Sequence, residues 1–460
     1  MKIPIFHDKP WPVRGINLGS WLNIEDFMIG LPGVDWQMRA EATQQWGAAD
    51  AGAFFDDWET HFLSEADIAW IAARGFNTVR LPFHYLHLET DAAPGVFTGR
   101  AWDAIARCLG WCETHGLAVM LDLHGAPGGQ NTTSPAGNAT GYVQLWQDKT
   151  YQDRSVALWT ELLQRFHRSP ALFSCNLLNE PMVNNHGPQT HAEQAAAMNA
   201  LNARMIDAIR GIDSKVWIAI DGPVRSSGGV RWLDPALFAN ERTIFCYHHY
   251  PLEAHEGSVN YERNQSCRDE NADDEVFLRQ EISEEIEFAA RIDRPVVLGE
   301  FGLPTHWDPV MGSRILQAQL KIHEELGWGW LLWSYKDVNT MGLLNPTPDR
   351  PWRKWIEDPA RTERSTRVCE AFHRYYDEVV IPNLPKTPAN SRTHDAAFDD
   401  ARRGLTRVLL DSAIRDLAQI PTATRIAMME DFNLRHCTVR EDIWCELAPW
   451  LGSTEPMRSL

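Results

Sequence analysis

Short runs of apolar and β-branched residues recur along the chain, and most are continuously apolar rather than alternating with polar positions. Such a run is typical of a strand that is buried on both faces, as in a parallel sheet covered by helices. Eight runs fit this description, at residues 13–19, 76–82, 117–124, 172–181, 216–222, 243–250, 295–302 and 327–335.

The segments between these runs carry apolar residues at helical spacing. They predict helices at residues 64–74, 100–115, 153–167, 192–210, 274–291 and 309–326. The first opens with Ser64 and Asp67, a pair typical of a capped helix N-terminus. Strand and helix therefore alternate, and eight strands over about 380 residues predict an α/β chain with a (β/α)₈ TIM barrel. The alternative, an open doubly wound sheet, usually carries an early GxGxxG phosphate loop, and the sequence has none.

The segment after the last predicted strand has a different character. Residues 384–395 are rich in Pro, Ser, Thr and Asn, which favours a linker. After it, Leu405, Val408, Leu409 and Ala413 repeat at helical spacing. We therefore divide the chain into a catalytic barrel at 1–384, a linker at 385–395 and a small helical extension at 396–460. The C-terminal helices are expected either to cap the barrel or to form an oligomer interface.

Polar residues gather where the predicted strands end, and the longest insertions, 22–61 and 125–146, follow the first and third strands. In a (β/α)₈ barrel the carboxyl ends of the strands converge on the rim where catalysis takes place. The strand-end residues are Arg80, Asp122, His124, Asn179, Glu180, Asp221, His248, Tyr250, Glu300, Trp333, Ser334 and Tyr335.

Two of these strand-end residues are glutamates. Glu180 closes the run CNLLNEP and Glu300 lies in VVLGEFG, so each is expected to project from the rim. Hydrolysis of a glycosidic bond needs one carboxylic acid to protonate the leaving oxygen and a second carboxylate to attack the sugar or activate water. The pair therefore predicts a glycosidase. The alternative for each glutamate is a structural ion pair with a nearby arginine.

Neighbouring polar residues fit around this pair. Asn179 is placed to donate to a sugar 2-hydroxyl group. Arg80 and Tyr250 are placed to hydrogen-bond Glu300 and keep it ionised, as a nucleophile requires. For Arg80 a purely structural ion pair stays open.

Three further rim residues are candidates for substrate binding. His124 and His248 supply donors near the sugar or near Glu180. Trp333 offers a flat surface for the apolar face of a sugar ring. The chain contains 20 Trp, a count that fits stacking on a ligand and fits core packing equally well.

Composition limits the classes of molecule that the protein is expected to bind. The formal net charge is −19, which disfavours nucleic acid and anionic membranes. No apolar stretch is long enough to cross a membrane, the N-terminus lacks the pattern of a signal peptide, and the 8 Cys form no CxxC pair. We expect a cytoplasmic protein with a carbohydrate substrate. We expect no metal and no cofactor, because HExxH, GxSxG and P-loop motifs are absent from the sequence.

Seven motifs, RGINLGSWL, NTVRLPFHY, LDLHGAPGGQN, LLNEP, YHHY, LGEFG and WLLWSYKD, follow one another between Pro12 and Asn383. This order resembles the retaining glycoside hydrolases of family 5. The GINLGSWL, HGAPGGQN and HHY motifs look most like its exo-β-1,3-glucanase and β-glucosidase branch.

The resemblance implies roles for particular residues. It makes Glu180 the acid/base and Glu300 the nucleophile of a double displacement, with Glu180 protonated in the resting enzyme. It assigns substrate binding to Arg80, His124, Asn179, His248, Tyr250 and Trp333.

The sequence also departs from that branch. Secreted fungal exo-glucanases carry signal peptides and disulfides, of which this chain shows no sign, and its insertions and helical extension lie outside the motifs. Three other functions therefore stay open: a β-glycosidase acting on a lipid, steroid or plant glycoside, an endo-β-glucanase, and a catalytically silent glycan-binding protein.

Overall fold

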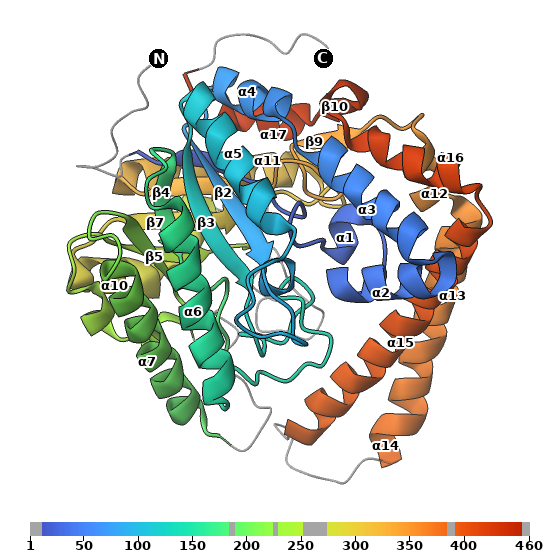
Figure 1. Ribbon diagram of the computed structural model, residues 1–460, viewed down its shortest axis with the longest axis horizontal. Coiled ribbons are helices and arrows are strands. Elements are labelled where there is room, and N and C mark those ends of the chain that lie inside the picture. The colour runs from blue at the N-terminus through green and yellow to red at the C-terminus, as the bar shows by residue number, and fades with distance from the viewer. Residues whose placement is uncertain (1–11, 184–188, 224–228, 252–273, 384–391, 453–460) are drawn as a thin grey trace.

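The computed structural model describes residues 12–183, 189–223, 229–251, 274–383 and 392–452 (Figure 1). All eight predicted runs form strands of one closed parallel barrel, in which each strand pairs with its neighbours in chain order and β8 closes on β1. The predicted (β/α)₈ barrel is therefore confirmed. The strands are β1 (Arg14–Asn17), β2 (Thr78–His84), β3 (Ala118–Gly125), β4 (Leu172–Asn176), β5 (Trp217–Asp221), β6 (Thr243–His248), β7 (Val296–Phe301) and β8 (Gly329–Leu332).

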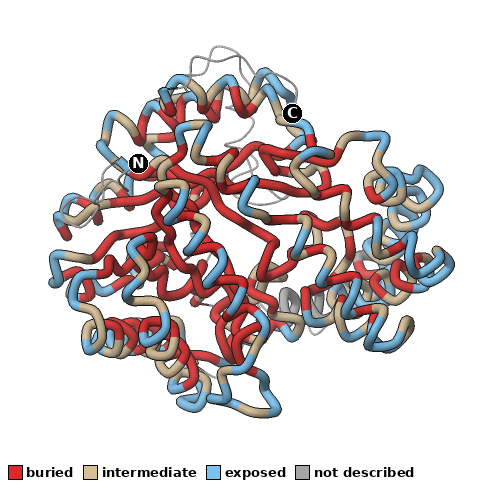
Figure 2. Tube along the Cα trace, turned by 45° about the horizontal axis from the view of Figure 1, so that its top comes forward, coloured by how far each residue is buried: buried red, intermediate tan, exposed pale blue. Residues whose placement is uncertain are grey.

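Helices follow the strands and cover the outside of the barrel (Figures 1 and 2). They are α4 (Glu65–Ala73), α5 (Ala101–His115), α6 (Lys149–Phe166), α7 (His191–Arg210), α9 (Asp274–Glu281), α10 (Ser283–Ile292) and α11 (Pro309–Leu326). The Asp67 carboxylate accepts from the Ser64 amide at 2.8 Å, as the predicted N-terminal cap requires. The helix predicted at 274–291 is two helices, because the backbone leaves the helical conformation at Ile282.

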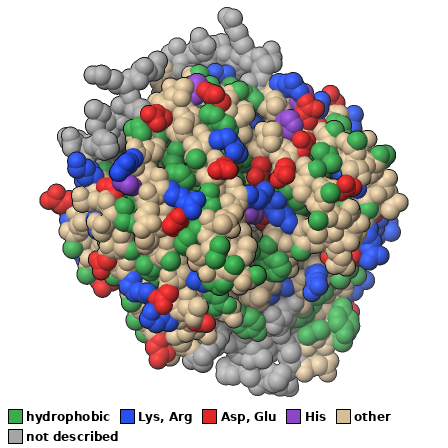
Figure 3. All heavy atoms as spheres, in the orientation of Figure 1, with side chains coloured by type: hydrophobic (Ala, Val, Ile, Leu, Met, Phe, Trp, Pro, Cys, Tyr) green, Lys and Arg blue, Asp and Glu red, His purple; other side chains and the backbone are tan. Residues whose placement is uncertain are grey.

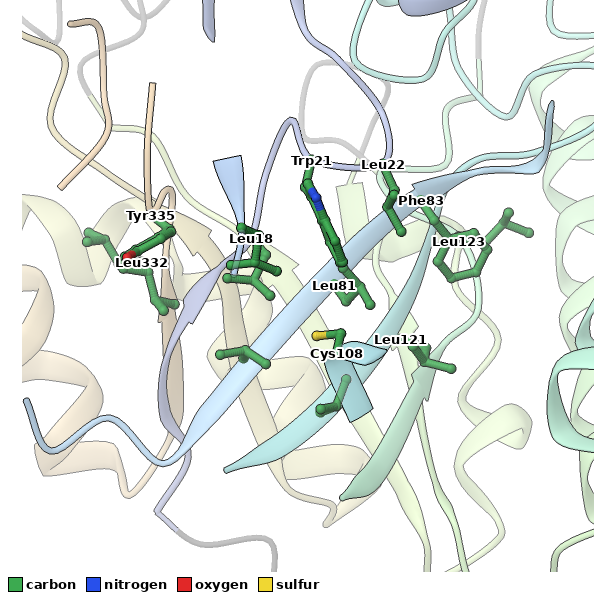
Figure 4. Close-up of a cluster of buried hydrophobic side chains, with 14 of the residues drawn as sticks. Leu18, Trp21, Leu22, Leu81, Phe83, Cys108, Leu121, Leu123, Leu332 and Tyr335 are labelled. Atoms are coloured by element: carbon green, nitrogen blue, oxygen red, sulfur yellow. The ribbon is translucent and has the colours of Figure 1, made fainter. Parts of the chain in front are cut away.

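Successive side chains in a strand point to opposite sides. In β2 and β3, apolar side chains on one side pack against the helices, and side chains of the site lie on the other. Leu81 and Phe83 of β2, with Leu121 and Leu123 of β3, face outward toward Cys108 of α5 (Figure 4). Of the positions that alternate with these, Arg80 and Asp122 carry polar side chains of the rim. The inner part of the barrel is filled by a separate apolar cluster of Val13, Ala118, Met120, Phe173, Trp217, Ala219, Ile244, Cys246, Val297 and Leu331.

The two long rim insertions fold differently. The first contains three helices that the strand-and-helix pattern did not predict, α1 (Asp26–Ile29), α2 (Asp35–Trp46) and α3 (Ala48–Phe62). The second, the segment between β3 and α6, contains no helix or strand and is shaped by turns. We call it the β3–α6 loop, residues 126–148.

The C-terminal part wraps around one side of the barrel. Its elements are β9 (Leu344–Pro346), α12 (Pro351–Ile356), α13 (Pro359–Tyr375), the π-helix η5 (Tyr376–Val380), α14 (Ile381–Asn383), α15 (Arg392–Ala418), α16 (Thr422–Ala427), the 3₁₀ helices η6 (Met428–Phe432) and η7 (Leu434–His436), β10 (Cys437–Val439) and α17 (Glu441–Leu447). Helix α15 begins inside the predicted linker, whose residues 385–391 lie outside the described residues. The extension is not wholly helical, since β10 pairs antiparallel with β9.

Several hydrogen bonds attach this extension to the rest of the chain. Trp46 Nε1 donates to the Ile414 carbonyl at 3.1 Å, and the buried Lys336 Nζ donates to the Phe432 carbonyl at 2.9 Å. Arg440 Nη1 donates to the carbonyl of Leu303 at 2.6 Å. The extension is thus packed against the barrel, and the oligomer expected from its helices stays a prediction.

The described helices include none that is long and apolar enough to span a membrane. The N-terminal segment on which the signal-peptide prediction rests, residues 1–11, lies outside the described residues. All seven cysteines in the described part of the chain are free thiols. On the face shown in Figure 3, acidic and basic side chains are interspersed.

Candidate active site

The two predicted glutamates meet at the carboxyl ends of the strands. Glu300 lies on β7, and Glu180 follows β4 by four residues. A carboxylate oxygen of each lies within 4.8 Å of the other and of a ring nitrogen of His248. Glu300 is almost fully buried, whereas the Glu180 side chain is 22% exposed. Glu180 is therefore the more accessible of the two carboxylates.

Arg80 lies at the centre of the site and is fully buried. Its Nη1 donates to Glu300 Oε1 at 2.7 Å, and the Tyr250 hydroxyl donates to Glu300 Oε2 at 3.1 Å. Both contacts predicted for Glu300 are present. Arg80 also makes an ion pair with Asp122 at 3.1 Å, so it has a structural role as well. Its remaining acceptors are the side-chain oxygens of Asn17 at 3.0 Å, Asn176 at 2.9 Å and Asn179 at 2.7 Å.

These contacts fix the orientation of the Asn179 amide. Its oxygen accepts from Arg80, so its Nδ2 is turned toward His124 Nε2, 3.4 Å away. The amide nitrogen is thus held beside His124 and away from Arg80.

His248 connects the two carboxylates. Its Nδ1 lies 2.9 Å from Glu180 Oε1 and 3.5 Å from Glu300 Oε2, and its Nε2 lies 3.6 Å from Asp221. Gly299 leaves room for the imidazole, because a Cβ at that position would come within 2.9 Å of His248 Nε2. One imidazole is therefore surrounded by three carboxylates.

This arrangement sets the pKa values of the three groups. Burial lowers the pKa of His248, but the carboxylates of Glu300, Glu180 and Asp221 outweigh burial and raise it. Burial raises the pKa of Glu180, but the hydrogen bond and charge of His248 outweigh burial and lower it. Burial also raises the pKa of Glu300, and there it prevails over the charges of His248 and Arg80. The lowered pKa of Glu180 and the raised pKa of His248 favour a proton on His248 over one on Glu180 in the free enzyme, whereas Glu180 was expected to be protonated at rest.

A second acidic pair surrounds His124. Its Nδ1 lies 2.7 Å from Asp122 and its Nε2 lies 3.4 Å from Glu25. Burial lowers the pKa of His124, but these two carboxylates outweigh it and raise the pKa to about 10. Burial raises the pKa of Glu25 to about 7. The His124 ring stacks on Trp333, with ring centroids 5.5 Å apart and planes inclined by 12°.

Trp333 also borders an apolar cluster. It packs with Met28 and Met341, and Phe27 and Tyr250 lie against them. The ring is 2% exposed in the free enzyme, so little of its face is open. Trp330 is fully buried and belongs to the core. It therefore fits the expectation that some of the tryptophans serve core packing and not ligand stacking.

Sequence reasoning missed several residues of the site. Asn17 and Asn176 lie inside strands, where the only signal was a polar residue in an apolar run. Glu25 was hidden in the first insertion. In the β3–α6 loop, Gln130 Nε2 donates to the Asn179 carbonyl at 3.0 Å and Asn131 Nδ2 donates to the Glu180 carbonyl at 3.0 Å.

Potential metal ligands also cluster here. Within the described residues, Glu180, His248 and Glu300 form one such group and Asp221, Cys246 and His248 form another. In the first group the histidine and Glu180 are already in direct contact at 2.9 Å. That distance favours a shared proton between the two side chains.

Comparison with known proteins identifies the family. The profile described as "Cellulase (glycosyl hydrolase family 5)" matches residues 37–339. The chain belongs to glycosyl hydrolase family 5. It is a glycosidase of this family, and the family resemblance drawn from the seven motifs is confirmed.

The relatives of this family 5 chain include enzymes with different names. A beta-xylosidase from Phanerodontia chrysosporium is 30% identical over 363 residues, covering 75% of this chain and 71% of the relative. Endoglucanase C from Acetivibrio thermocellus is 27% identical over 308 residues, covering 60% of this chain and 85% of the relative. A probable glucan 1,3-beta-glucosidase A from Emericella nidulans is 25% identical over 384 residues, covering 72% of this chain and 86% of the relative.

Proposed function

We propose that this protein is a retaining, exo-acting β-glycoside hydrolase that cleaves β-glucosidic bonds of oligosaccharides or small glycosides. The observation that carries the proposal is that one carboxylate oxygen of Glu180 lies within 4.8 Å of one carboxylate oxygen of Glu300. Retaining enzymes hold their carboxyl groups about 5–5.5 Å apart, whereas inverting enzymes leave about 6.5–9.5 Å for a water molecule. The short spacing therefore supports direct attack by one carboxylate.

The contacts of each glutamate support separate roles. Glu300 is buried and held by Arg80 and Tyr250, which orient its oxygens, and the charge of Arg80 opposes the rise in the pKa of Glu300 that burial causes. Glu180 is more exposed and lies 2.9 Å from His248, whose pKa is raised. Glu300 therefore suits the nucleophile and Glu180 suits the group that exchanges protons with substrate and water.

The reaction needs one proton on the set of Glu180, His248 and Glu300. Substrate binding displaces water from Glu180, which raises its pKa, and the proton passes from His248 Nδ1 to Glu180 Oε1. Glu300 then attacks the anomeric carbon while Glu180 protonates the leaving oxygen, and the glycosidic bond breaks. A glycosyl ester of Glu300 remains. Water, deprotonated by Glu180, attacks the same carbon and releases Glu300 and the sugar with its configuration retained.

Buried polar atoms around the carboxylates support a hydroxylated ligand. Asp122 Oδ1 and His248 Nε2 have no hydrogen-bond partner among the described residues. A buried polar atom without a partner is costly, and sugar hydroxyl groups would satisfy such atoms. Asn179, His124 and Trp333 lie around the same space and are proposed to bind the sugar.

The names of the relatives bear on the bond and the mode of cleavage. The relatives named beta-xylosidase and glucan 1,3-beta-glucosidase support removal of terminal units, and the relative named endoglucanase supports the alternative of internal cleavage. The apolar cluster of Phe27, Met28, Tyr250, Met341 and Trp333 supports a second candidate, a glycoside with an apolar aglycone.

Nitrophenol release from a panel of β-glycosides (glucoside, galactoside, mannoside, xyloside and laminaribioside) tests the proposal, with Glu300→Ala run in parallel. We expect one glycone to be preferred and its hydrolysis to be lost in the variant. Activity that survives Glu300→Ala would contradict the assigned nucleophile. Inactivity on the whole panel, and on libraries of glycolipids and oligosaccharides, would contradict the enzyme function.

A further inference from the structure

The backbone of Glu180 adopts an unusual conformation. Its φ is +44°, in the left-handed region that non-glycine residues rarely occupy. Such a conformation persists only where the surroundings hold it, and it concentrates at functional sites. Two contacts hold it here. The Glu180 amide donates to Asp221 Oδ2 at 3.1 Å, and its carbonyl accepts from Asn131 Nδ2 at 3.0 Å.

Asn131 is itself fixed by a second asparagine in the β3–α6 loop. Asn131 is fully buried, and its carbonyl accepts from Asn138 Nδ2 at 2.7 Å. On its other side, Asn138 Oδ1 accepts from the Thr140 and Gly141 amides, each at 2.9 Å. One side chain therefore connects the segment that touches Glu180 with the outer turn of the loop.

The outer turn is contacted by Arg403 of the C-terminal helix α15. The Arg403 guanidinium lies against Gly141, so that a Cβ at Gly141 would come within 2.0 Å of Arg403 Nη1. Gly141 also has φ +72°, which suits glycine. In Figure 1 the pair α13 and α15 stands out from the barrel on the side toward which the β2 arrow points.

The β3–α6 loop also contacts the first insertion. Ser134 Oγ of the same loop lies 3.5 Å from Asp26 Oδ1, at the start of α1. Burial raises the pKa of Asp26, and the charge of Arg402 on α15 opposes the rise.

We propose that α15 positions the catalytic acid Glu180 through the β3–α6 loop, with contacts running from Arg403 to Gly141, Asn138, Asn131 and the Glu180 carbonyl. Asn138 and Arg403 are then positioning residues that touch no substrate. The inference rests on the proposed function, because it concerns the group that protonates the leaving oxygen. It gives the C-terminal extension a role in the chemistry of the barrel.

Leaving-group dependence separates this role from general support of the fold. An alkyl or sugar leaving group departs only when an acid protonates it, so its rate depends on the alignment of Glu180. A dinitrophenolate leaves without protonation. Misplacing Glu180 therefore slows cleavage of an alkyl glycoside and spares the first step with a dinitrophenyl glycoside, whereas general loss of structure slows both.

The experiment compares two variants of the full-length protein. Asn138→Asp keeps the acceptor for Thr140 and Gly141 but removes the donor to the carbonyls of Asn131 and Tyr142. Arg403→Ala removes the contact with Gly141, and Arg403→Lys tests rescue of its charge. Arg407→Ala, an exposed position on the same helix, is the matched control. Rates are measured on a methyl and a dinitrophenyl β-glycoside of the preferred glycone, with Glu180→Ala as reference.

For Asn138→Asp and Arg403→Ala we expect kcat/KM on the methyl glycoside to fall about tenfold and on the dinitrophenyl glycoside by less than about twofold. Arg407→Ala should change neither. Equal losses on both substrates, or no loss on either, would overturn the positioning role. If Glu180→Ala itself fails to discriminate between the substrates, the acid assignment fails and the inference falls with it.

Discussion

Replacing Arg80 by lysine tests how the site is held together. The guanidinium is fully buried and donates to Glu300 at 2.7 Å while pairing with Asp122 at 3.1 Å. Lysine keeps the positive charge but offers one compact ammonium in place of a planar fork of donors. The substitution therefore removes the planar arrangement of hydrogen-bond donors and keeps the positive charge.

The expected loss follows from the acceptors that Arg80 serves. Three amide oxygens, those of Asn17, Asn176 and Asn179, accept from it at 3.0, 2.9 and 2.7 Å. An ammonium drawn to the two carboxylates leaves most of these oxygens unsatisfied. At about 1–3 kcal/mol for each buried acceptor, the free energy of unfolding should fall by roughly 3–5 kcal/mol. We expect kcat/KM to fall about 100-fold, because the nucleophile is no longer held in line.

The assay pairs chemical unfolding with kcat/KM on the preferred nitrophenyl β-glycoside. Arg154→Lys is the matched control, since Arg154 is buried on α6 and pairs with Glu89 and Asp91, each at 2.9 Å, outside the site. The control should lose stability and keep its kcat/KM. A folded Arg80→Lys enzyme whose kcat/KM stays within about threefold of the parent would refute the positioning of Glu300 by Arg80.

Three further predictions concern protons and burial. The pKa of His248 is raised, so the proton needed for catalysis is lost only above the ordinary histidine value of about 6.5. His248→Asn should move the basic limb of the kcat/KM profile to lower pH. An unmoved limb would argue against His248 as the source of the catalytic proton. The pKa of His124 is raised to about 10, so its contribution to stability is complete below about pH 6.5 and is lost as pH rises toward 10. Unfolding curves of His124→Gln, measured across this pH range, should not show that loss of stability. Lys336 is buried against Asp67, so Lys336→Met should lower the free energy of unfolding by about 3–5 kcal/mol. A melting temperature equal to that of the parent would contradict this.

The barrel could be predicted because its strands are buried on both faces and leave a plain apolar signal. The site residues at strand ends were equally visible, since Arg80, Glu180 and Glu300 each interrupt or close an apolar run. The register that brings them within hydrogen-bond distance depends on barrel closure, which no local pattern encodes.

Other features left a weaker signal. Helices α1 to α3 lie in an insertion whose apolar residues face the C-terminal extension as well as the barrel, as the Trp46 bond to Ile414 illustrates. Strand β10 has only three residues and exists because it pairs with β9. The raised pKa of His248 follows from three carboxylates that come from three different strand ends, and the sequence alone gives no distance between them.

The stereochemistry of the first-formed sugar tests the central claim most directly. Proton NMR follows the anomer released from the preferred nitrophenyl β-glycoside, before mutarotation mixes the two forms. Double displacement through Glu300 predicts that the β anomer appears first. The α anomer appearing first would mean single displacement by water and would contradict the retaining mechanism and the nucleophile assigned to Glu300.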